Sequence, residues 1–173
     1  MPQTYQRIGE VVLGSNANQV TFNNIPQTYT DLIVDISAKS DLSTFGDAFS
    51  LWINNSSSSI VSTSVNVGDT STILSNNSTI GLPYAQGYFA GNSSANWGNA
   101  RVQIYNYTNA SGSVGSIVSH GASSSGTFSN IFIRNSSFFT GANGVSRLDF
   151  YIIAAGGLIL TGSSFRLYGV LRA

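Results

Sequence analysis

The sequence predicts an all-β fold: a jelly-roll-like antiparallel β-sandwich in which residues 1–173 form a single domain. Three observations support this prediction. Apolar residues recur at every second position in many short segments, which is the period of a half-buried strand. The segments between them are rich in Ser, Asn and Gly, which favour turns. No stretch of about 11 residues or more carries the apolar stripe of an amphipathic helix.

The alternating segments predict strands in chain order at residues 6–13, 18–22, 31–39, 48–54, 100–107, 115–120, 130–135, 146–153 and 164–171. Weaker alternation predicts further strands near residues 60–67 and 79–90, giving nine to eleven in all. Their long and uneven connections favour a sandwich or jelly roll over an up-and-down barrel. Residues 53–100 form a loop-rich middle section, and alternation on both sides of its serine run favours a long surface loop over a flexible linker.

Residues 20–40 predict two strands that meet at a corner. Pro26 fixes its own φ and has no N–H to donate, so it suits a position between two strands. We expect apolar residues on both sides of this corner to pack inward: Phe22, Ile25, Leu32, Val34 and Ile36. In the last strand we expect Phe165, Leu167 and residues 168–170 to fill the core, with Arg166 facing outward.

The composition points to a neutral surface that belongs in an assembly. Charged residues make up 8% of the chain, against about 25% in ordinary soluble proteins, and the net charge is zero. A soluble protein near zero net charge is prone to self-association. The seven basic residues are scattered singly along the chain, which argues against binding to nucleic acid.

Cysteine, export and membrane signals are missing from the sequence. There is no cysteine, and therefore neither a disulfide framework nor a thiolate metal site. The longest apolar stretch, residues 150–160, is too short and too interrupted by glycine to span a bilayer. The first residues lack the basic and apolar regions of a signal peptide, so we expect synthesis in a cytosol without export.

Side chains that could carry chemistry are few. His120 is the one histidine, and its neighbour Ser119 would face the opposite side of a strand, so no hydrolytic triad is expected. Asp31 and Asp35 would lie about 13 Å apart on one strand, too far for a glycosidase pair. Asp41 and Asp47 bracket a loop that either binds a calcium ion or simply forms a solvated turn, and both readings stay open. We expect no catalytic residue, no cofactor and no metal.

Aromatic residues offer another kind of site. Trp97 lies in the Asn/Gly-rich segment 91–100, and two alternatives stay open for it: a surface ring that stacks on a sugar or anchors a protein contact, or a ring packed in the core. For Trp52 and Tyr105, which lie within alternating strands, we expect packing in the core.

Two motifs carry a resemblance to a known family: F-x-x-I-P-Q-T-Y-T-D-L at Phe22–Leu32 and S-x-F-x-L-Y-G at Ser163–Gly169. With the segments LWIN and ARVQIYNY between them, they resemble small β-sandwich virion proteins of tailed bacteriophages, especially cyanophage-like ones, over nearly the whole chain. The resemblance implies a jelly-roll or related sandwich, exposed on the particle and without enzymatic activity. Such modules occur as capsid decoration (cement) proteins and as tips of tail or head fibres.

The resemblance leads to a functional expectation. Because the first strand is reached by about Gln6, with no segment for a fibre shaft, we expect a decoration protein that binds the major capsid protein on the outer capsid surface. We expect a trimer that binds where capsid subunits meet and stabilises the shell. The alternative is a fibre tip that binds a host receptor or glycan; a polysaccharide depolymerase would need two carboxylates at glycosidase spacing.

The residues expected to make protein contacts lie in two places. Residues 1–6 are either an N-terminal arm that reaches a neighbour or simply the start of the first strand. The full set of candidate contact residues is Gln3, Tyr5, Gln6, Arg7, Tyr88 and Trp97.

Overall fold

The computed structural model describes residues 4–42, 46–56, 60–68, 73–76, 87–90, 97–108, 115–123, 131–139, 144–153 and 156–171. Side chains are described for 4–42, 49–56, 97–108, 144–153 and 156–171. The described residues contain strands and turns and no helix. The strands are β1 (Tyr5–Val12), β2 (Gln19–Phe22), β3 (Asp31–Ala38), β4 (Gly46–Ile53), β5 (Ile60–Gly68), β6 (Ile73–Asn76), β7 (Gly87–Ala90), β8 (Gly98–Ile104), β9 (Gly115–Ser123), β10 (Ile131–Phe139), β11 (Leu148–Ile152) and β12 (Ser164–Val170).

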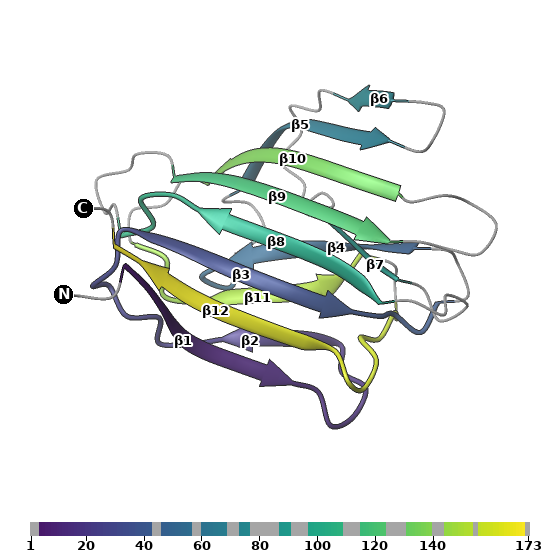
Figure 1. Ribbon diagram of the computed structural model, residues 1–173, viewed down its shortest axis with the longest axis horizontal. Helices are drawn as coiled ribbons and strands as arrows, with labels where there is room; N and C mark the ends of the chain where they lie inside the picture. Colours follow the sequence, from purple (N-terminus) through teal and green to yellow (C-terminus); the bar gives the residue numbers. More distant parts are fainter. Residues whose placement is uncertain are drawn as a thin grey trace.

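The strands form two antiparallel sheets packed face to face. One sheet has eight strands in the order β1-β12-β3-β8-β9-β10-β5-β6, and the other has four in the order β2-β11-β4-β7. Figure 1 shows the smaller sheet lying behind the larger one, with β5 and β6 extending beyond it. The all-β sandwich predicted from the sequence is confirmed, whereas the jelly-roll connectivity stays a prediction.

The core lies between the sheets and is built from the inward residues of both. In β3, Leu32, Val34 and Ile36 are buried at alternate positions, as expected. Phe150 lies at the centre, with its ring centroid 5.4 Å from that of Phe165 in the larger sheet. It also contacts Phe22 and Phe49 at 6.5 and 6.0 Å, so one aromatic cluster joins the two sheets.

The middle section, residues 53–100, contains more strand than its serine-rich sequence predicts. β5 matches the strand expected near residues 60–67, whereas the strand expected at 79–90 is described only at β7. β6 was not predicted, because four residues next to serine and asparagine give too little alternation to detect. The described residues therefore hold twelve strands instead of the expected nine to eleven.

The corner between β2 and β3 is held by side-chain hydrogen bonds to its backbone. Asn24 takes a positive φ of 53°, which lets the chain turn after β2. Ile25 is buried as predicted, and the Tyr107 hydroxyl donates to the carbonyl oxygen of Pro26. The Gln27 Nε2 group donates to the carbonyl oxygens of Ile25 and Val145, at 2.9 Å in both cases. These bonds fix the direction in which β3 starts.

The two sequence motifs meet in space. The Tyr29 ring, which follows the corner, lies so close to Gly169 of β12 that a Cβ at that position would overlap the ring. The Tyr29 hydroxyl donates to Gln6 Oε1 at 2.8 Å, so the same side chain also reaches β1. Glycine at position 169 is required by this close approach.

Candidate protein interface

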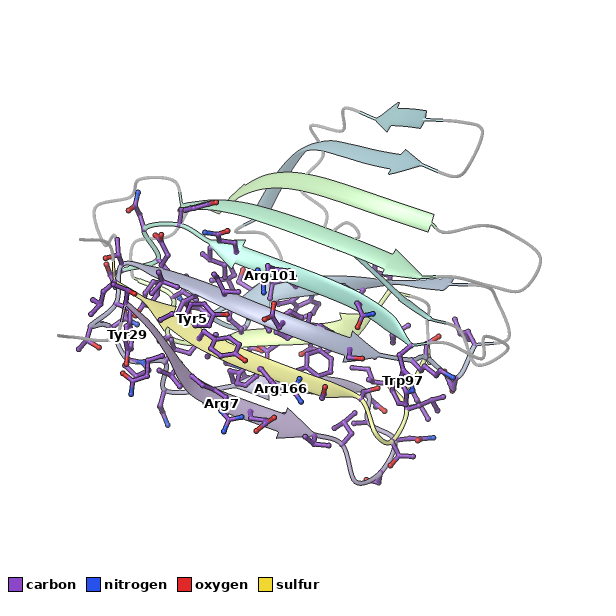
Figure 2. The ribbon with its side chains drawn as sticks, viewed as in Figure 1. Tyr5, Arg7, Tyr29, Trp97, Arg101 and Arg166 are labelled. Atoms are coloured by element: carbon purple, nitrogen blue, oxygen red, sulfur yellow. The ribbon has the colours of Figure 1, made fainter. Side chains whose placement is uncertain are left out.

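The outer face of the larger sheet carries a row of alternating charges across four strands. Cα partners in register place Glu10 opposite Arg166, Arg166 opposite Asp35, and Asp35 opposite Arg101. Arg166 Nε donates to Glu10 Oε1 at 2.8 Å. Arg101 binds both oxygens of Asp35, with Nε 2.6 Å from Oδ1 and Nη2 2.9 Å from Oδ2. The row crosses β1, β12, β3 and β8 and leaves its side chains accessible to solvent (Figure 2).

A pair of tyrosines lies beside this row. The Tyr5 and Tyr168 rings are stacked, with centroids 4.5 Å apart and an interplanar angle of 21°. Tyr168 was expected in the core and is instead half-buried on the outer face, because the face alternates along β12 and Arg166 two residues earlier already points outward. Phe165 and Leu167 are buried as expected. Tyr5 is 42% exposed, so the stack presents aromatic surface to a partner.

A β-bulge in β1 decides which residues share this face. The register with β12 shifts between Arg7 and Gly9, so Arg7 pairs with Tyr168 while Glu10 pairs with Arg166. Because three positions separate Arg7 and Glu10, a regular strand would place them on opposite faces. Here Arg7 Nη1 donates to Glu10 Oε2 at 2.8 Å, so both lie on the outer face.

The electrostatics of the face follow from these contacts. Burial is the main cause that raises the pKa of Tyr5, and the nearby Asp35 carboxylate raises it further while Arg101 lowers it. The hydrogen bonds that Arg101 donates to Asp35 raise the pKa of Arg101 above its already high value. Both pKa shifts favour the protonated form, so Tyr5 stays neutral and Arg101 stays charged at neutral pH.

The outer face of the smaller sheet holds a second cluster, in which the carboxylate is buried. Asp149 has no solvent exposure, and Arg147 Nε lies 2.8 Å from its Oδ2. Asp149 Oδ1 accepts two further hydrogen bonds, from Arg147 Nη2 at 2.8 Å and from the Thr21 hydroxyl at 2.6 Å. The Trp52 and Tyr151 rings lie beside this group with centroids 4.7 Å apart. Burial, followed by the Asp149 charge, raises the pKa of Tyr151.

Trp52 and Tyr105, which were expected in the core, are half-buried. In β4 the buried apolar residues alternate at Phe49, Leu51 and Ile53, so Trp52 lies on the outer face. The alternation of the segment was detected correctly, but the large aromatic ring was assigned to the wrong face.

Trp97 lies just before β8, at the other end of the larger sheet from Tyr5 (Figure 2). Its ring is 40% exposed, and the Lys39 ammonium lies 5.3 Å from the ring centroid. Gly162, with a positive φ of 85°, lies close to the six-membered ring of the indole, where an added Cβ would be 3.1 Å from Cη2. The exposed position agrees with one of the two alternatives for Trp97, the surface aromatic, and its role as a contact residue stays a prediction.

The candidate contact residues are thus only partly brought together. Tyr5, Gln6 and Arg7 belong to β1 and pair with β12, so they form the start of a strand, which was one of the two expectations for this segment. Within it, Gln6 lies on the inner side beside Tyr29 and does not share the face of Tyr5. Gln3 lies outside the described residues, and of Tyr88 the structure gives only the backbone of β7, in the smaller sheet.

The residues that complete the face were not among the candidate contact residues, although Arg166 faces outward as expected. Glu10, Asp35, Arg101, Arg166 and Tyr168 come from four strands that are far apart in the sequence. The alternation within each strand could be read from the sequence and assigns residues to one face or the other. It does not show which strands lie next to each other, and the face depends on that pairing.

Of the two aspartates that bracket the expected calcium loop, the structure describes the side chain of Asp41 alone, and calcium binding stays a prediction. Asp41 Oδ1 accepts a hydrogen bond from the Leu158 N–H at 2.8 Å, so this carboxylate holds a turn. The side chain of Asp47 lies outside the described residues, as does that of His120. Within the part of the chain that the structure describes, no three His, Cys, Asp or Glu side chains gather as a metal site would require. That part also contains no helix long and apolar enough to cross a membrane.

No protein-family model, curated protein or solved structure matches this chain.

Proposed function

We propose that this protein is a capsid decoration protein of a tailed bacteriophage, which binds the major capsid protein and stabilises the shell without catalysing a reaction. The observation that carries the proposal is the outer face of β1, β12, β3 and β8, where the Tyr5–Tyr168 stack lies beside paired charges. Tyrosine and arginine are enriched at protein interfaces, where a rigid ring provides contact area at a small entropic cost.

The arrangement also favours a specific register on the partner. The guanidinium and carboxylate groups of the face are already paired within the chain, so binding need not leave an isolated charge unpaired. A partner that covers the tyrosine stack would bury aromatic surface and meet a fixed pattern of charge around it. Many copies bound in this way would oppose disassembly by mass action.

The location of the protein tests the proposal. We expect quantitative mass spectrometry of purified phage particles to find hundreds of copies, in proportion to the major capsid protein. A handful of copies would contradict decoration and would favour a fibre or vertex.

Binding variants test the face itself. We expect Tyr5→Ser/Tyr168→Ser protein to lose binding to particles stripped of this protein. Tyr151→Ser, which removes a tyrosine from the other outer face, should leave binding unchanged. If both variants lost particle binding equally, the Tyr5–Tyr168 face would not be the surface that binds the capsid.

The second candidate function is the tip of a tail or head fibre that binds a host glycan. It is favoured by Trp97, whose exposed ring lies near a lysine and beside a glycine-containing turn, a suitable platform for a sugar ring. Under this function, Trp97→Ala would abolish adsorption of the protein to host cells, whereas Tyr5→Ser/Tyr168→Ser would not.

A further inference from the structure

The edge of the larger sheet at β1 provides a surface that the proposed function does not use. Among the described strands, β1 hydrogen-bonds only to β12, so its second edge carries backbone donors and acceptors without a neighbouring strand (Figure 1). Such an edge is a template for the addition of another strand. Its eight residues, Tyr5–Val12, are of typical strand length or longer.

The outer face of this edge strand has a symmetric order of side chains. Tyr5, Arg7, Glu10 and Val12 follow one another along that face, in the order apolar, positive, negative, apolar. Tyr5 and Val12 are both exposed, at 42% and 60%. The bulge creates this order, because it brings Arg7 and Glu10 to the same side of the strand.

An antiparallel copy of β1 matches this order. When Arg7 of one protomer lies opposite Glu10 of a second copy, the two-fold axis places Glu10 opposite the second copy's Arg7, and Tyr5 opposite its Val12. The extra residue of the bulge does not disturb the register, since both copies contain it between Arg7 and Glu10. Opposite charges placed directly across an antiparallel pair are stabilising, and like charges are destabilising.

We propose that two copies of this chain associate through antiparallel pairing of their β1 edges, with Arg7 of each protomer opposite Glu10 of the other, so that the larger sheet continues through both. The side chains are available for this contact. The Arg7 side chain is 55% exposed. It donates one hydrogen bond, from Nη1, to Glu10 of its own chain, and its guanidinium carries further N–H donors for a second copy. Glu10 accepts a hydrogen bond from Arg166 at its other oxygen, Oε1. Because the chain has a net charge of zero, two copies approach each other without overall electrostatic repulsion.

The contact is isologous and closes at two copies, which differs from the trimer expected from the sequence. It does not depend on the proposed function, because it concerns the free protein. It also joins the two Tyr5–Tyr168 faces into one continuous surface.

Charge exchange tests the pairing. Light scattering after size exclusion should give the mass of a dimer for the unmodified chain and of a monomer for both Arg7→Glu and Glu10→Arg, since each variant places like charges opposite one another twice. An equimolar mixture of the two variants should give a heterodimer, because every pair across the interface is then Glu opposite Arg. A charge effect within one chain cannot produce this recovery.

Each outcome decides for or against the pairing. A monomer or trimer for the unmodified chain, unchanged dimers in both variants, or no recovery on mixing would overturn it. Circular dichroism checks that the variants fold. If a reversed charge prevents folding, Arg7→Gln and Glu10→Gln replace it, and each should weaken the dimer by up to about 30-fold through loss of two symmetry-related ion pairs.

Discussion

The two outer faces of the sandwich use the same residue types to different ends. Each has an arginine that binds both oxygens of an aspartate next to a pair of aromatic rings: Arg101 and Asp35 on the larger sheet, Arg147 and Asp149 on the smaller. Asp35 retains 31% of its exposure whereas Asp149 has none. The exposed pair is available to a partner, and the buried pair belongs to the structure. Burial, more than residue identity, separates an interface from a structural cluster.

The largest expected effect on stability is the loss of the buried aspartate, Asp149, compared with the loss of the exposed aspartate, Asp35. Asp149→Ala removes the acceptor of both Arg147 and the Thr21 hydroxyl in a buried setting, and should lower the free energy of unfolding by about 2–4 kcal/mol. Asp35→Ala is the matched control and should cost less than about 1 kcal/mol, because its pair is solvent-screened. Urea titrations of both variants measure the difference. Equal losses would remove the distinction between the faces.

A smaller effect is expected on the inner side of β12, directly next to the tyrosine stack. Gly169→Ala forces a Cβ into the Tyr29 ring and should cost about 1–3 kcal/mol of stability, as overpacking does. Gly14→Ala is the control, since no atom lies within 4 Å of the added Cβ. Thermal unfolding of the two variants tests whether the two sequence motifs depend on each other, and a Gly169→Ala protein as stable as the control would contradict this.

The stacked tyrosines should contribute less again. A double-mutant cycle of Tyr5→Ala and Tyr168→Ala should give a coupling free energy of about 0.5–1.5 kcal/mol, the usual value for aromatic pairs. The corresponding cycle for Trp52 and Tyr151 provides the comparison on the smaller sheet. No measurable coupling between Tyr5 and Tyr168 would show that the stack is not maintained in solution.

The strands were predictable because alternation is a local property. The segments that became β3, β8 and β12 could be located from their apolar period alone, and the buried face of β3 was assigned correctly. Pro26 correctly marked the corner between β2 and β3. These features depend on residues close to one another in the sequence.

The candidate interface could not be predicted in the same way. The charge row needs the pairing of β1, β12, β3 and β8, which join residues up to 156 positions apart. The bulge that places Arg7 beside Glu10 breaks the alternation from which faces are assigned. Tyr168 was expected in the core, although its spacing of two residues from Arg166 indicates the outer face.

The smallest expected effect concerns the ionisation of Tyr5, whose pKa is raised by burial and a neighbouring aspartate just as that of Tyr151 is on the smaller sheet. The pKa of Tyr5 is raised above 10.0 by burial and by Asp35, so the folded state holds the phenol proton more tightly than the unfolded state. Stability from this group is complete below pH 10 and falls as the pH rises through the folded pKa. In Asp35→Asn the attraction of Arg101 for the tyrosinate is no longer opposed, and the pKa should move down. Difference titrations of tyrosinate absorbance against Tyr5→Phe in each background measure this, and an unchanged midpoint would contradict coupling between the stack and the charge row.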